Sequence, residues 1–524
     1  MELVYLWVEK YKNIYRQGFN FSPRFECDFD EDTKKLTISE NKDYVSIFPK
    51  NINVTAIVGE NGSGKSNLLD LINNDGYENP EVSPYPIMYY TLKAINIYYN
   101  KKENKLYIEI RNFDINIENK TQIKFEKKGM DYKQTIFIKP IPKHDYEEKV
   151  SLLNFRINNP HIDYPFNFPN IIKFGIHDDF HDLLESIKNT DFDFHSTYSL
   201  YEEDKEKRFK IFHILLLLSF IHNHKLEINI QASENFQTTI SDLENIIEGE
   251  IRNQINNFIN ILKNSLEGYS HTPDNYINIK YLNEDFFKIY IDVIKRKNDK
   301  ELLPYKGKKV FNFDLHPKMS DGQYQLTYLF NNIYSQIDNE TIVLIIDEGE
   351  NLLHPNWQKK YINYLLKFLE ENFKEKTFHI ILSSHSPFIL SDLPKENVIF
   401  LQKDEDGNCK NVSKETSIET FGANIHTLLS NGFFMSDGLM GEFAKSKINE
   451  AIDNLHGKSQ SLSQKQIKSI IDSIGEPFLQ IKLEQMYKEK FGLYDEIEEL
   501  QKQQEEINLK IKQLKKQKTE NAKS

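Results

Sequence analysis

Apolar positions along the chain follow three patterns, and each pattern predicts a different kind of element. Residues 3–8 alternate and are rich in Val, Leu, Tyr and Trp, which predicts a first strand. Short strand-like segments follow at 19–25 and 36–39, and a further strand is expected over 51–58. Two more apolar segments, at 94–99 and 106–110, predict a hairpin. The early part of the chain therefore favours a β-rich lobe.

The later part of the chain shows continuous apolar runs and helical spacing instead. The runs at 341–346 and 378–382 are typical of strands in a parallel sheet that is covered on both faces. Apolar residues at helical spacing predict helices over 208–222, 241–266 and 357–372. The last segment carries a heptad pattern, which predicts a short coiled-coil helix. Its core positions are Leu493, Ile497, Leu500, Gln504, Ile507, Ile511 and Leu514.

These patterns predict an α/β fold with a mixed sheet, a β-rich N-terminal lobe, a helical insertion and a helical C-terminal region. We expect residues 1–114 and 311–419 to form two halves of one domain. Residues 115–310 read as an insertion with helical segments. Residues 420–524 read as a helical region that ends in the coiled coil and binds a partner.

Composition excludes several classes of protein. The chain has 524 residues, 39% of them hydrophobic, and its two cysteines, Cys27 and Cys409, lie too far apart in sequence to suggest a zinc site or a disulfide framework. The apolar run at 211–221 is about half the length needed to span a bilayer, so no membrane segment is expected, and a cytoplasmic location fits. The net charge of −13 does not attract DNA, although basic segments at 205–210, 295–297, 306–309 and 510–518 leave a local contact open.

Residues 59–66 combine three glycines with a lysine and two serines directly after an apolar strand. Strand, glycine loop and helix in this order are the context that a phosphate-binding loop requires. A plain glycine turn before a helix is the alternative, and the preceding strand disfavours it. Lys65 would neutralise the β and γ phosphates of ATP, and Ser66 would bind Mg²⁺. The predicted nucleotide-binding residues are Gly59, Glu60, Asn61, Gly62, Ser63, Gly64, Lys65 and Ser66.

An apolar strand that ends in two acids, Asp347 and Glu348, is the second candidate element. The strand places both acids at the C-terminal edge of a parallel sheet, where ligands sit. Asp347 would hold the Mg²⁺ ion, and Glu348 would orient and deprotonate the attacking water. An ordinary strand followed by an acidic turn is the alternative, and the phosphate-binding loop makes it the weaker one.

Two shorter motifs flank the acidic strand. Residues 319–323 read Met-Ser-Asp-Gly-Gln, in which Ser320 is also a suitable helix N-cap. Residues 383–387 read Ser-Ser-His-Ser-Pro after the strand at 378–382, so His385 is expected at the end of that strand. Ser386 and Pro387 are expected to begin a helix.

The order of these motifs along the chain resembles that of the ABC-type ATPases: the glycine loop comes first, then the short glycine motif, the acidic strand and the histidine. The resemblance covers about residues 1–75 and 315–400, with Met319 and Asp321 standing where that family's signature has Leu and Gly. It implies an ABC ATPase head with a P-loop core, in which Ser320, Gly322 and Gln323 bind the nucleotide of a second subunit. It also implies that His385 contacts the γ-phosphate.

More than half of the chain separates Lys65 from Asp347, which disfavours a transporter subunit and resembles the split heads of the SMC, RecF and OLD branch. In that branch a segment similar to residues 11–14 helps to hold nucleotide, which implicates Lys12 and Asn13. The turn at 352–355 resembles the part of that branch that contacts the second subunit. The glutamine that commonly joins the Mg²⁺ shell is not placed, and Gln122 and Gln134 are the only candidates early in the insertion.

The acidic triplet at 404–406 looks like a hairpin turn rather than the nuclease site of the OLD proteins. The stretch at 420–444 resembles stand-alone bacterial anti-phage ATPases of the Septu type, also found with retrons, and more loosely those of the PARIS type. That resemblance implies an ATP-hydrolysing homodimer that forms a nucleotide sandwich, with higher assembly left open, and that scaffolds and regulates a separate HNH or TOPRIM nuclease. The alternative is a RecF-like or SMC-like DNA repair or recombination ATPase that binds DNA directly.

Overall fold

The computed structural model of the chain describes most of its length. The described residues are 2–74, 92–128, 134–139, 146–176, 205–224, 226, 236–267, 276–282, 286–294, 311–432 and 439–521. They form two compact units, Met1–Phe434 and Met435–Ser524. The basic segments at 295–297 and 306–309 lie outside the described residues.

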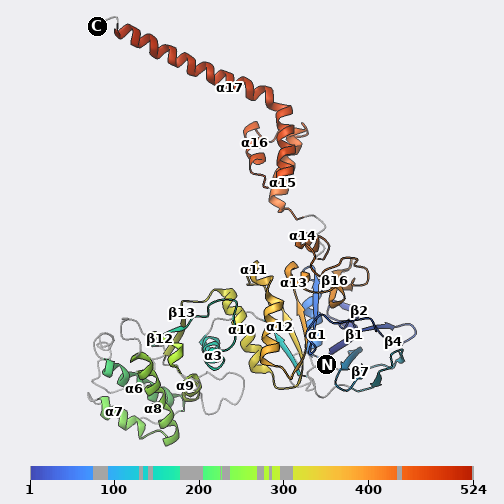
Figure 1. Ribbon diagram of the computed structural model, residues 1–524, viewed down its shortest axis with the longest axis vertical. Coiled ribbons are helices and arrows are strands. Elements are labelled where there is room, and N and C mark those ends of the chain that lie inside the picture. The colour runs from blue at the N-terminus through green and yellow to red at the C-terminus, as the bar shows by residue number, and fades with distance from the viewer. Residues whose placement is uncertain are drawn as a thin grey trace. The chain divides into compact units, whose positions relative to one another are not determined.

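The described part of the first unit is built on an eleven-stranded mixed sheet (Figure 1). Five neighbouring strands are parallel: β10 (Gln134–Ile138), β14 (Thr341–Asp347), β15 (Thr377–Ser383), β5 (Ile52–Gly59) and β16 (Val398–Lys403). The sheet continues through β17 (Cys409–Asn411), β2 (Ile14–Asn20), β1 (Glu2–Tyr11), β6 (Ala94–Asn100), β7 (Lys105–Arg111) and β9 (Lys124–Glu126). The predicted α/β class with a mixed sheet is confirmed.

Helices cover both faces of the parallel strands, which explains their continuous apolar sequences. Helix α1 (Lys65–Asn74) buries its apolar side against one face, in the same core as Ile345 of β14. Helices α10 (Asp321–Gln336) and α12 (Tyr361–Asn372) share the opposite core with Leu344. Successive residues of a strand point to opposite faces, so both must be apolar when both faces are covered.

The N-terminal lobe carries a second, three-stranded sheet of β3 (Phe25–Asp30), β4 (Lys35–Glu40) and β8 (Asn116–Asn119), which packs on β1, β6 and β7 through a separate core. The predicted hairpin is present as β6 and β7, paired from Ala94 with Arg111 to Asn100 with Lys105.

The described elements between Tyr146 and His316 have their own apolar core, formed by helices and a small sheet, and from here on we call them the insertion. The strands β8, β9 and β10, which lie within the range 115–310 predicted for the insertion, belong instead to the two sheets described above. The described elements of the insertion are α3 (Tyr146–Asn158), β11 (Ile171–Ile176), α6 (Lys205–Asn223), α7 (Phe236–Glu244), α8 (Gly249–Glu267), β12 (Tyr276–Asn278), η2 (Ile279–Tyr281), α9 (Phe286–Ile294) and β13 (Phe311–His316). The single helix expected over 241–266 is wrong, because the chain turns between α7 and α8. Ile246 and Ile247 bond back to Leu243 and Glu244 there.

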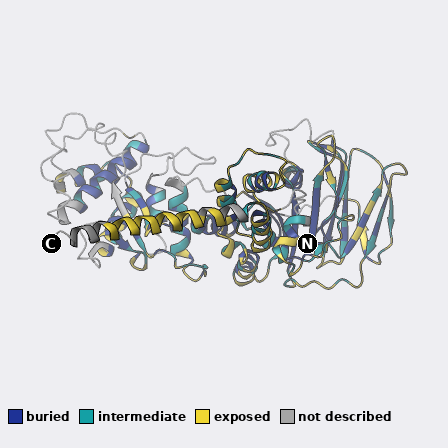
Figure 2. Ribbon diagram, turned by 90° about the horizontal axis from the view of Figure 1, so that it is seen from above, coloured by how far each residue is buried: buried dark blue, intermediate teal, exposed yellow. Residues whose placement is uncertain are grey.

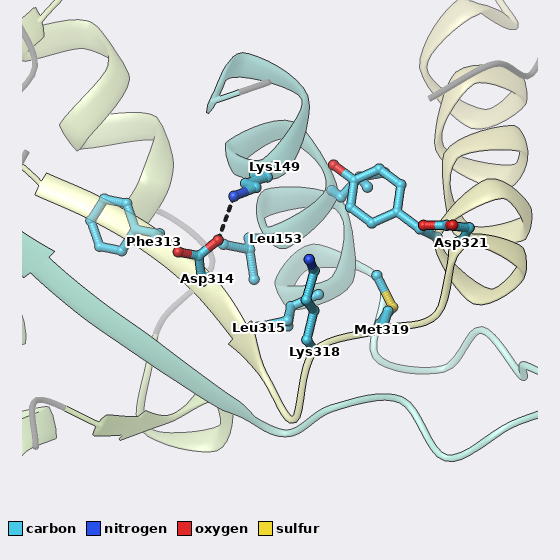
Figure 3. Close-up of a pocket in the computed structure, with 10 residues that line it drawn as sticks. Lys149, Leu153, Phe313, Asp314, Leu315, Lys318, Met319 and Asp321 are labelled. Atoms are coloured by element: carbon cyan, nitrogen blue, oxygen red, sulfur yellow. Dashed lines mark hydrogen bonds and ion pairs between the residues drawn. The ribbon is translucent and has the colours of Figure 1, made fainter. Parts of the chain in front are cut away.

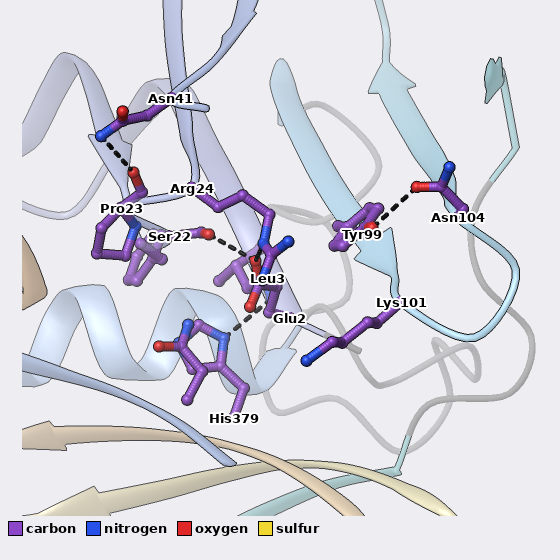
Figure 4. A network of polar contacts seen from close by, with 12 residues as sticks. Glu2, Leu3, Ser22, Pro23, Arg24, Asn41, Tyr99, Lys101, Asn104 and His379 are labelled. Atoms are coloured by element: carbon purple, nitrogen blue, oxygen red, sulfur yellow. Dashed lines mark hydrogen bonds and ion pairs between the residues drawn. The ribbon is translucent and has the colours of Figure 1, made fainter. Parts of the chain in front are cut away.

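A buried histidine links the N-terminal strand β1 to β15 and β5 in the main sheet (Figure 4). His379 lies on β15, and its Nδ1 atom accepts the backbone N–H of Leu3, at 2.9 Å. Its Nε2 atom lies 2.9 Å from Oγ1 of Thr55 on β5 and 3.3 Å from Nδ2 of Asn53. Burial lowers the pKa of His379 to about 3, so the imidazole is neutral in the folded protein.

The second unit consists of α15 (Glu442–Leu455), α16 (Gln464–Asp472) and α17 (Pro477–Asn521). Leu483 and Tyr487 of α17 share a small core with Ile467 and Ile471 of α16. The predicted coiled-coil segment is the last part of α17, which is 45 residues long and therefore much longer than expected. No helix in the described ranges is both long and apolar enough to cross a bilayer.

Candidate nucleotide site

Three parallel strands end side by side at the candidate site. In the strand register Asp347 of β14 lies opposite Ser383 of β15, and Ser383 lies opposite Ile57 of β5. The glycine loop leaves β5 at Gly59, shortly after Ile57. The loop, the acidic strand end and the histidine segment therefore meet at one edge of the sheet, although more than half of the chain separates the first from the second.

Close backbone approach explains the glycines of the loop at residues 59–66. A Cβ atom on Gly59 would lie 2.1 Å from the carbonyl oxygen of Leu401 in the neighbouring strand β16. Gly64 has a φ of 106°, and a Cβ there would lie 3.0 Å from the Cβ of Cys409. Both positions exclude a side chain, so the loop stays tight around the start of α1.

Lys65 is held inside the loop at the first position of α1. Its Nζ atom donates to the carbonyl oxygens of Gly59 and Glu60, both at 3.0 Å. Only 5% of the residue is exposed, and burial lowers the pKa of its ammonium group, against the opposing effect of Glu348 and Asp347. The ammonium group is thus fixed beside the loop's own carbonyls, close to the two acids.

The hairpin turn between β1 and β2 lies against the same loop. The side chain of Asn13 donates to the carbonyl oxygen of Gly62, at 3.3 Å, and accepts from Asn67 of α1, at 2.7 Å. Lys12 forms an ion pair with Asp70 of α1, at 2.5 Å. Both predicted residues of this turn therefore lie next to the loop and its helix.

Asp347 is almost completely buried at the end of β14, with 3% of its surface exposed. Its Oδ1 atom accepts a hydrogen bond from the hydroxyl of Ser383, at 2.6 Å. Its Oδ2 atom lies 3.4 Å from Nζ of Lys139, which follows directly after β10. Lys139 was not singled out from the sequence, because its place beside Asp347 depends on the parallel pairing of β10 with β14.

Gln134 cannot join Asp347 at this edge. It begins β10, opposite Ile342 at the start of β14, and therefore lies at the other end of the strand pair. Its side chain accepts the backbone N–H groups of Asp338 and Asn339, at 3.0 and 3.2 Å. At the correct edge of this strand stands a lysine, Lys139.

Glu348 and His385 approach each other above the strand ends. Their side chains lie 3.5 Å apart, from Oε1 to Nε2, and Oε2 of Glu348 accepts a hydrogen bond from Asn351, at 2.6 Å. Glu348 has a φ of 54°, in the left-handed region that costs a non-glycine residue about 1–2 kcal/mol. Burial, and then Lys65, lower the pKa of His385.

A third acid, Glu350, accepts hydrogen bonds from the segment that carries His385. It is buried, and its Oε1 atom accepts from the hydroxyl of Ser384 and from the backbone N–H of His385, at 3.2 Å. Burial raises the pKa of Glu350 to about 6. Glu350 belongs to the acidic segment noted in the sequence. Its contact with the backbone of His385 depends on burial, which the sequence does not show.

The motif at 319–323 begins helix α10 as expected. Ser320 is the N-cap: its hydroxyl accepts from Gln323 N, at 3.4 Å, and the Gln323 side chain accepts from Ser320 N, at 2.8 Å. Gly322 packs against the loop after the acidic strand, because a Cβ there would lie 2.9 Å from the carbonyl oxygen of Leu352.

Gln325 links α10 to the loop after Glu348. The residue is 1% exposed, its Nε2 atom donates to the carbonyl oxygen of Gly349 at 3.1 Å, and its Oε1 atom accepts from Leu352 N at 3.0 Å. These two hydrogen bonds tie the first turns of α10 to the loop that follows Glu348.

A pocket of about 380 Å³ lies behind the motif, where α3 and β13 of the insertion meet the start of α10 (Figure 3). Lys149 of α3 and Asp314 of β13 form an ion pair across it, at 2.5 Å. Met319 and Asp321 line the same pocket on either side of Ser320. The insertion is thus in contact with the segment that carries Ser320.

The residues at the strand ends fit a magnesium nucleotide. The Ser63 hydroxyl is buried in the loop and has no hydrogen-bond partner among the described residues. The Lys65 ammonium donates to loop carbonyls, and phosphate oxygens would replace these as acceptors. Ser66 is exposed at the start of α1, where it can meet a ligand, and Asn61 is exposed at the loop's tip. A buried carboxylate, a hydroxyl and an ammonium group are suited to Mg²⁺ and phosphate.

Comparison with known proteins adds a likeness to SMC head domains. No protein-family model and no curated protein matches the chain. Among solved structures, the SMC head with an extended coiled coil bound to the C-terminal domain of ScpA, from Pyrococcus furiosus, is 13% identical, with a TM-score of 0.27; the match covers 78% of this chain and 95% of that one.

The SMC head from Thermotoga maritima is 14% identical, with a TM-score of 0.25, and the match covers 79% of this chain and 98% of that one. An SMC head bound to the C-terminal winged-helix domain of ScpA is 12% identical, with a TM-score of 0.26, over 79% and 97% of the two chains. The α/β class of this chain stands on its own sheet and on the helices that cover it.

Proposed function

We propose that the chain is an ABC-type ATPase of the SMC, RecF and OLD branch, which hydrolyses ATP to ADP and phosphate. The loop at 59–66 binds the phosphates, with Lys65 as the neutralising cation, and Lys12 and Asn13 close it from the side. Ser66 and Asp347 hold Mg²⁺, which neutralises phosphate charge when bound. Glu348 orients and deprotonates the attacking water, and His385 contacts the terminal phosphate.

The observation that carries this proposal is the meeting of four side chains at one sheet edge. Lys65, Asp347, Glu348 and His385 come from three separate strand ends, and the electrostatic effects of Glu348 and Asp347 reach both Lys65 and His385. If the charged groups were only a structural ion-pair cluster, the glycine loop beside them would be unexplained. If the loop were only a glycine turn, the buried acid beside it would be unexplained. The combination favours phosphate chemistry.

The site is completed by a second copy of the chain in this proposal. Ser320, Gly322 and Gln323 begin a helix whose N-terminus is suited to an anion, and Ser320 and Gln323 are accessible. They would grip the γ-phosphate of the nucleotide on the facing subunit, which gives a head-to-tail nucleotide-sandwich dimer. Gln325 then connects that grip to the loop beside Glu348 of its own chain.

Nucleotide binding and dimerisation are tested separately. Lys65→Ala should abolish ATP binding measured by calorimetry, whereas Lys102→Ala, at an exposed ion pair with Glu340, should leave it unchanged. Ser320→Arg should leave ATP binding intact and abolish the increase in mass that ATP causes in light scattering. Unchanged ATP affinity in Lys65→Ala would refute the loop assignment.

The biological role that we propose is control of a nuclease in bacterial anti-phage defence, in the cytoplasm. The chain would scaffold a separate HNH or TOPRIM nuclease through its C-terminal region and release or restrain it according to nucleotide occupancy. The support is the resemblance of residues 420–444 to Septu-type ATPases. Co-expression with the neighbouring gene should co-purify a nuclease; a neighbouring gene of another kind, or no complex, would contradict this role.

A second candidate is a DNA repair or recombination ATPase that binds DNA directly. The observation that favours it is the exposed lysine-rich end of α17, where Lys510, Lys512 and Lys515 face solvent. Salt-dependent DNA binding by the isolated chain, with DNA-stimulated hydrolysis that is lost on replacing these lysines with glutamine, would select this candidate.

A further inference from the structure

The second half of α17 exposes a regular apolar stripe. Every described side chain from residue 496 to 515 is exposed (Figure 2), including Ile497 at 53% and Leu500, Ile507 and Leu514 at 59% each. A soluble helix ordinarily buries such a stripe, because apolar surface left in water is unfavourable and a solitary helix is only marginally stable.

The spacing of the stripe is that of a coiled-coil seam. From Ile497 the apolar positions follow at intervals of three and four residues, interrupted only by Gln504. A repeat of 3.5 residues keeps one seam facing a partner helix, with each side chain inserted between four side chains of that partner. Leu509 is also exposed but lies off this seam, which makes it a useful control position.

The charges along this helix are separated by sign. Residues 494–506 contain six acidic residues and one lysine, whereas residues 507–519 contain five lysines and no acidic residue. Two copies that run in opposite directions would place each acidic half beside a basic half. Two copies that run in the same direction would place acid beside acid and lysine beside lysine, which is unfavourable.

The seam is also symmetric under reversal. If Ile497 of one copy lies opposite Leu514 of the other, then Leu500 lies opposite Ile511, and Gln504 lies opposite Ile507. Every core position is thus matched, and each Gln504 faces an aliphatic side chain rather than a second glutamine. This pairing is a two-fold, self-complementary contact of the kind that closes a dimer.

We propose that residues 497–514 of α17 pair with the same residues of a second copy of this chain as an antiparallel two-stranded coiled coil. The contact is independent of ATP and separate from the nucleotide sandwich. Charge complementarity and the matched seam both select a second copy, in the reversed direction, as the occupant of the stripe.

Disulfide trapping in the full-length protein tests the direction of pairing. The double variant Ile497→Cys, Leu514→Cys should form disulfide-linked dimers under mild oxidation without nucleotide, since Cys27 and Cys409 are buried. Each single variant should cross-link at least tenfold less, because positions 497 of antiparallel copies are about 25 Å apart at 1.5 Å per residue. Efficient cross-linking of Ile497→Cys alone, or none in the double variant, would overturn the proposal.

The mass of the protein in solution tests whether the apolar stripe of α17 holds the dimer together. Leu500→Glu combined with Ile511→Glu should convert the nucleotide-free dimer to monomer in light scattering, and Leu509→Glu should leave the dimer intact. A monomeric wild-type protein without nucleotide would refute the proposal, and so would equal effects of the seam and off-seam variants. ATP binding should be unchanged in all three proteins, so a failure here leaves the nucleotide site standing.

Discussion

The Nζ atom of Lys139 lies 3.4 Å from the buried Oδ2 atom of Asp347, at the edge where the metal ion is proposed to bind. Lys139 is about half exposed and Asp347 is almost fully buried, so the lysine can swing away while the acid stays in place. The ammonium group of Lys139 would therefore compete with the proposed metal ion for Asp347.

Lys139→Ala should lower the Mg²⁺ concentration needed for half-maximal nucleotide binding by about two- to fivefold. The lysine competes with the metal for Asp347, and an ion pair with one exposed partner is worth about 1 kcal/mol or less. Magnesium titration of fluorescent ATP-analogue binding measures the effect. Lys367→Ala, which removes an exposed ion pair with Asp163 in another part of the unit, is the control. Equal magnesium dependence in both variants and the wild type would remove Lys139 from the site.

Glu348→Gln should slow ATP turnover by at least about 100-fold, because general base catalysis contributes that much or more. The amide keeps the size of the side chain and leaves the backbone at φ 54° unchanged, so ATP binding should be retained and the ATP-bound dimer should last longer. Phosphate release and light scattering measure the two effects. Glu340→Gln, at an exposed ion pair, is the matched control. Normal turnover in Glu348→Gln would mean that another group activates the water.

Gln325→Leu should uncouple the start of α10 from the acidic loop. The change leaves the carbonyl of Gly349 and the N–H of Leu352 without this partner, which costs about 1–3 kcal/mol of stability. We expect ATP affinity to be retained, while the ATP-dependent contact between subunits and the rate of ATP turnover both fall. Gln336→Leu, at an exposed position on the same helix, should change none of these quantities. A Gln325→Leu protein with normal turnover would show that the link does not transmit the dimer contact.

His379 should make the folded protein sensitive to acid. Its pKa is about 3 in the folded state and about 6.5 when unfolded, so the unfolded chain binds the extra proton first and stability falls as the pH drops from 6.5 toward 3. Between pH 7.5 and 5 the wild type should lose about 2 kcal/mol relative to His379→Gln, at 1.36 kcal/mol per unit of pKa difference. Urea unfolding at several pH values measures both free energies. Parallel pH profiles for the two proteins would contradict the assignment.

Local sequence predicted most of the elements that build the site. The apolar runs at 341–346 and 378–382 became β14 and β15, because a strand covered on both faces requires apolar residues at every position. The glycine loop lies between a strand and a helix as expected. The structure brings Lys65, Asp347, Glu348 and His385 together, and their catalytic roles stay predictions.

The residues that sequence reasoning missed depend on contacts between distant segments. Lys139 lies beside Asp347 only because β10 pairs with β14, and the insertion separates these two strands along the chain. In addition, β10 is too short for its apolar residues to predict a strand. Gln325 and Glu350 act through burial and through hydrogen bonds to loop backbone, which residue spacing does not reveal. The break between α7 and α8 was missed because apolar residues continue at helical spacing across the turn.

The central position of β5 in the sheet has a consequence for synthesis of the chain. Its neighbours on either side, β15 and β16, are made only after the whole insertion, with Thr55 paired to Ile381 and Ile57 to Ile399. At translation rates of about 5–20 residues per second, β5 waits roughly 15–65 s for the first of these partners. During that time an apolar strand with two open edges must be shielded from other chains. Aggregation is therefore a hazard for this protein while its N-terminal lobe awaits the second half of the sheet.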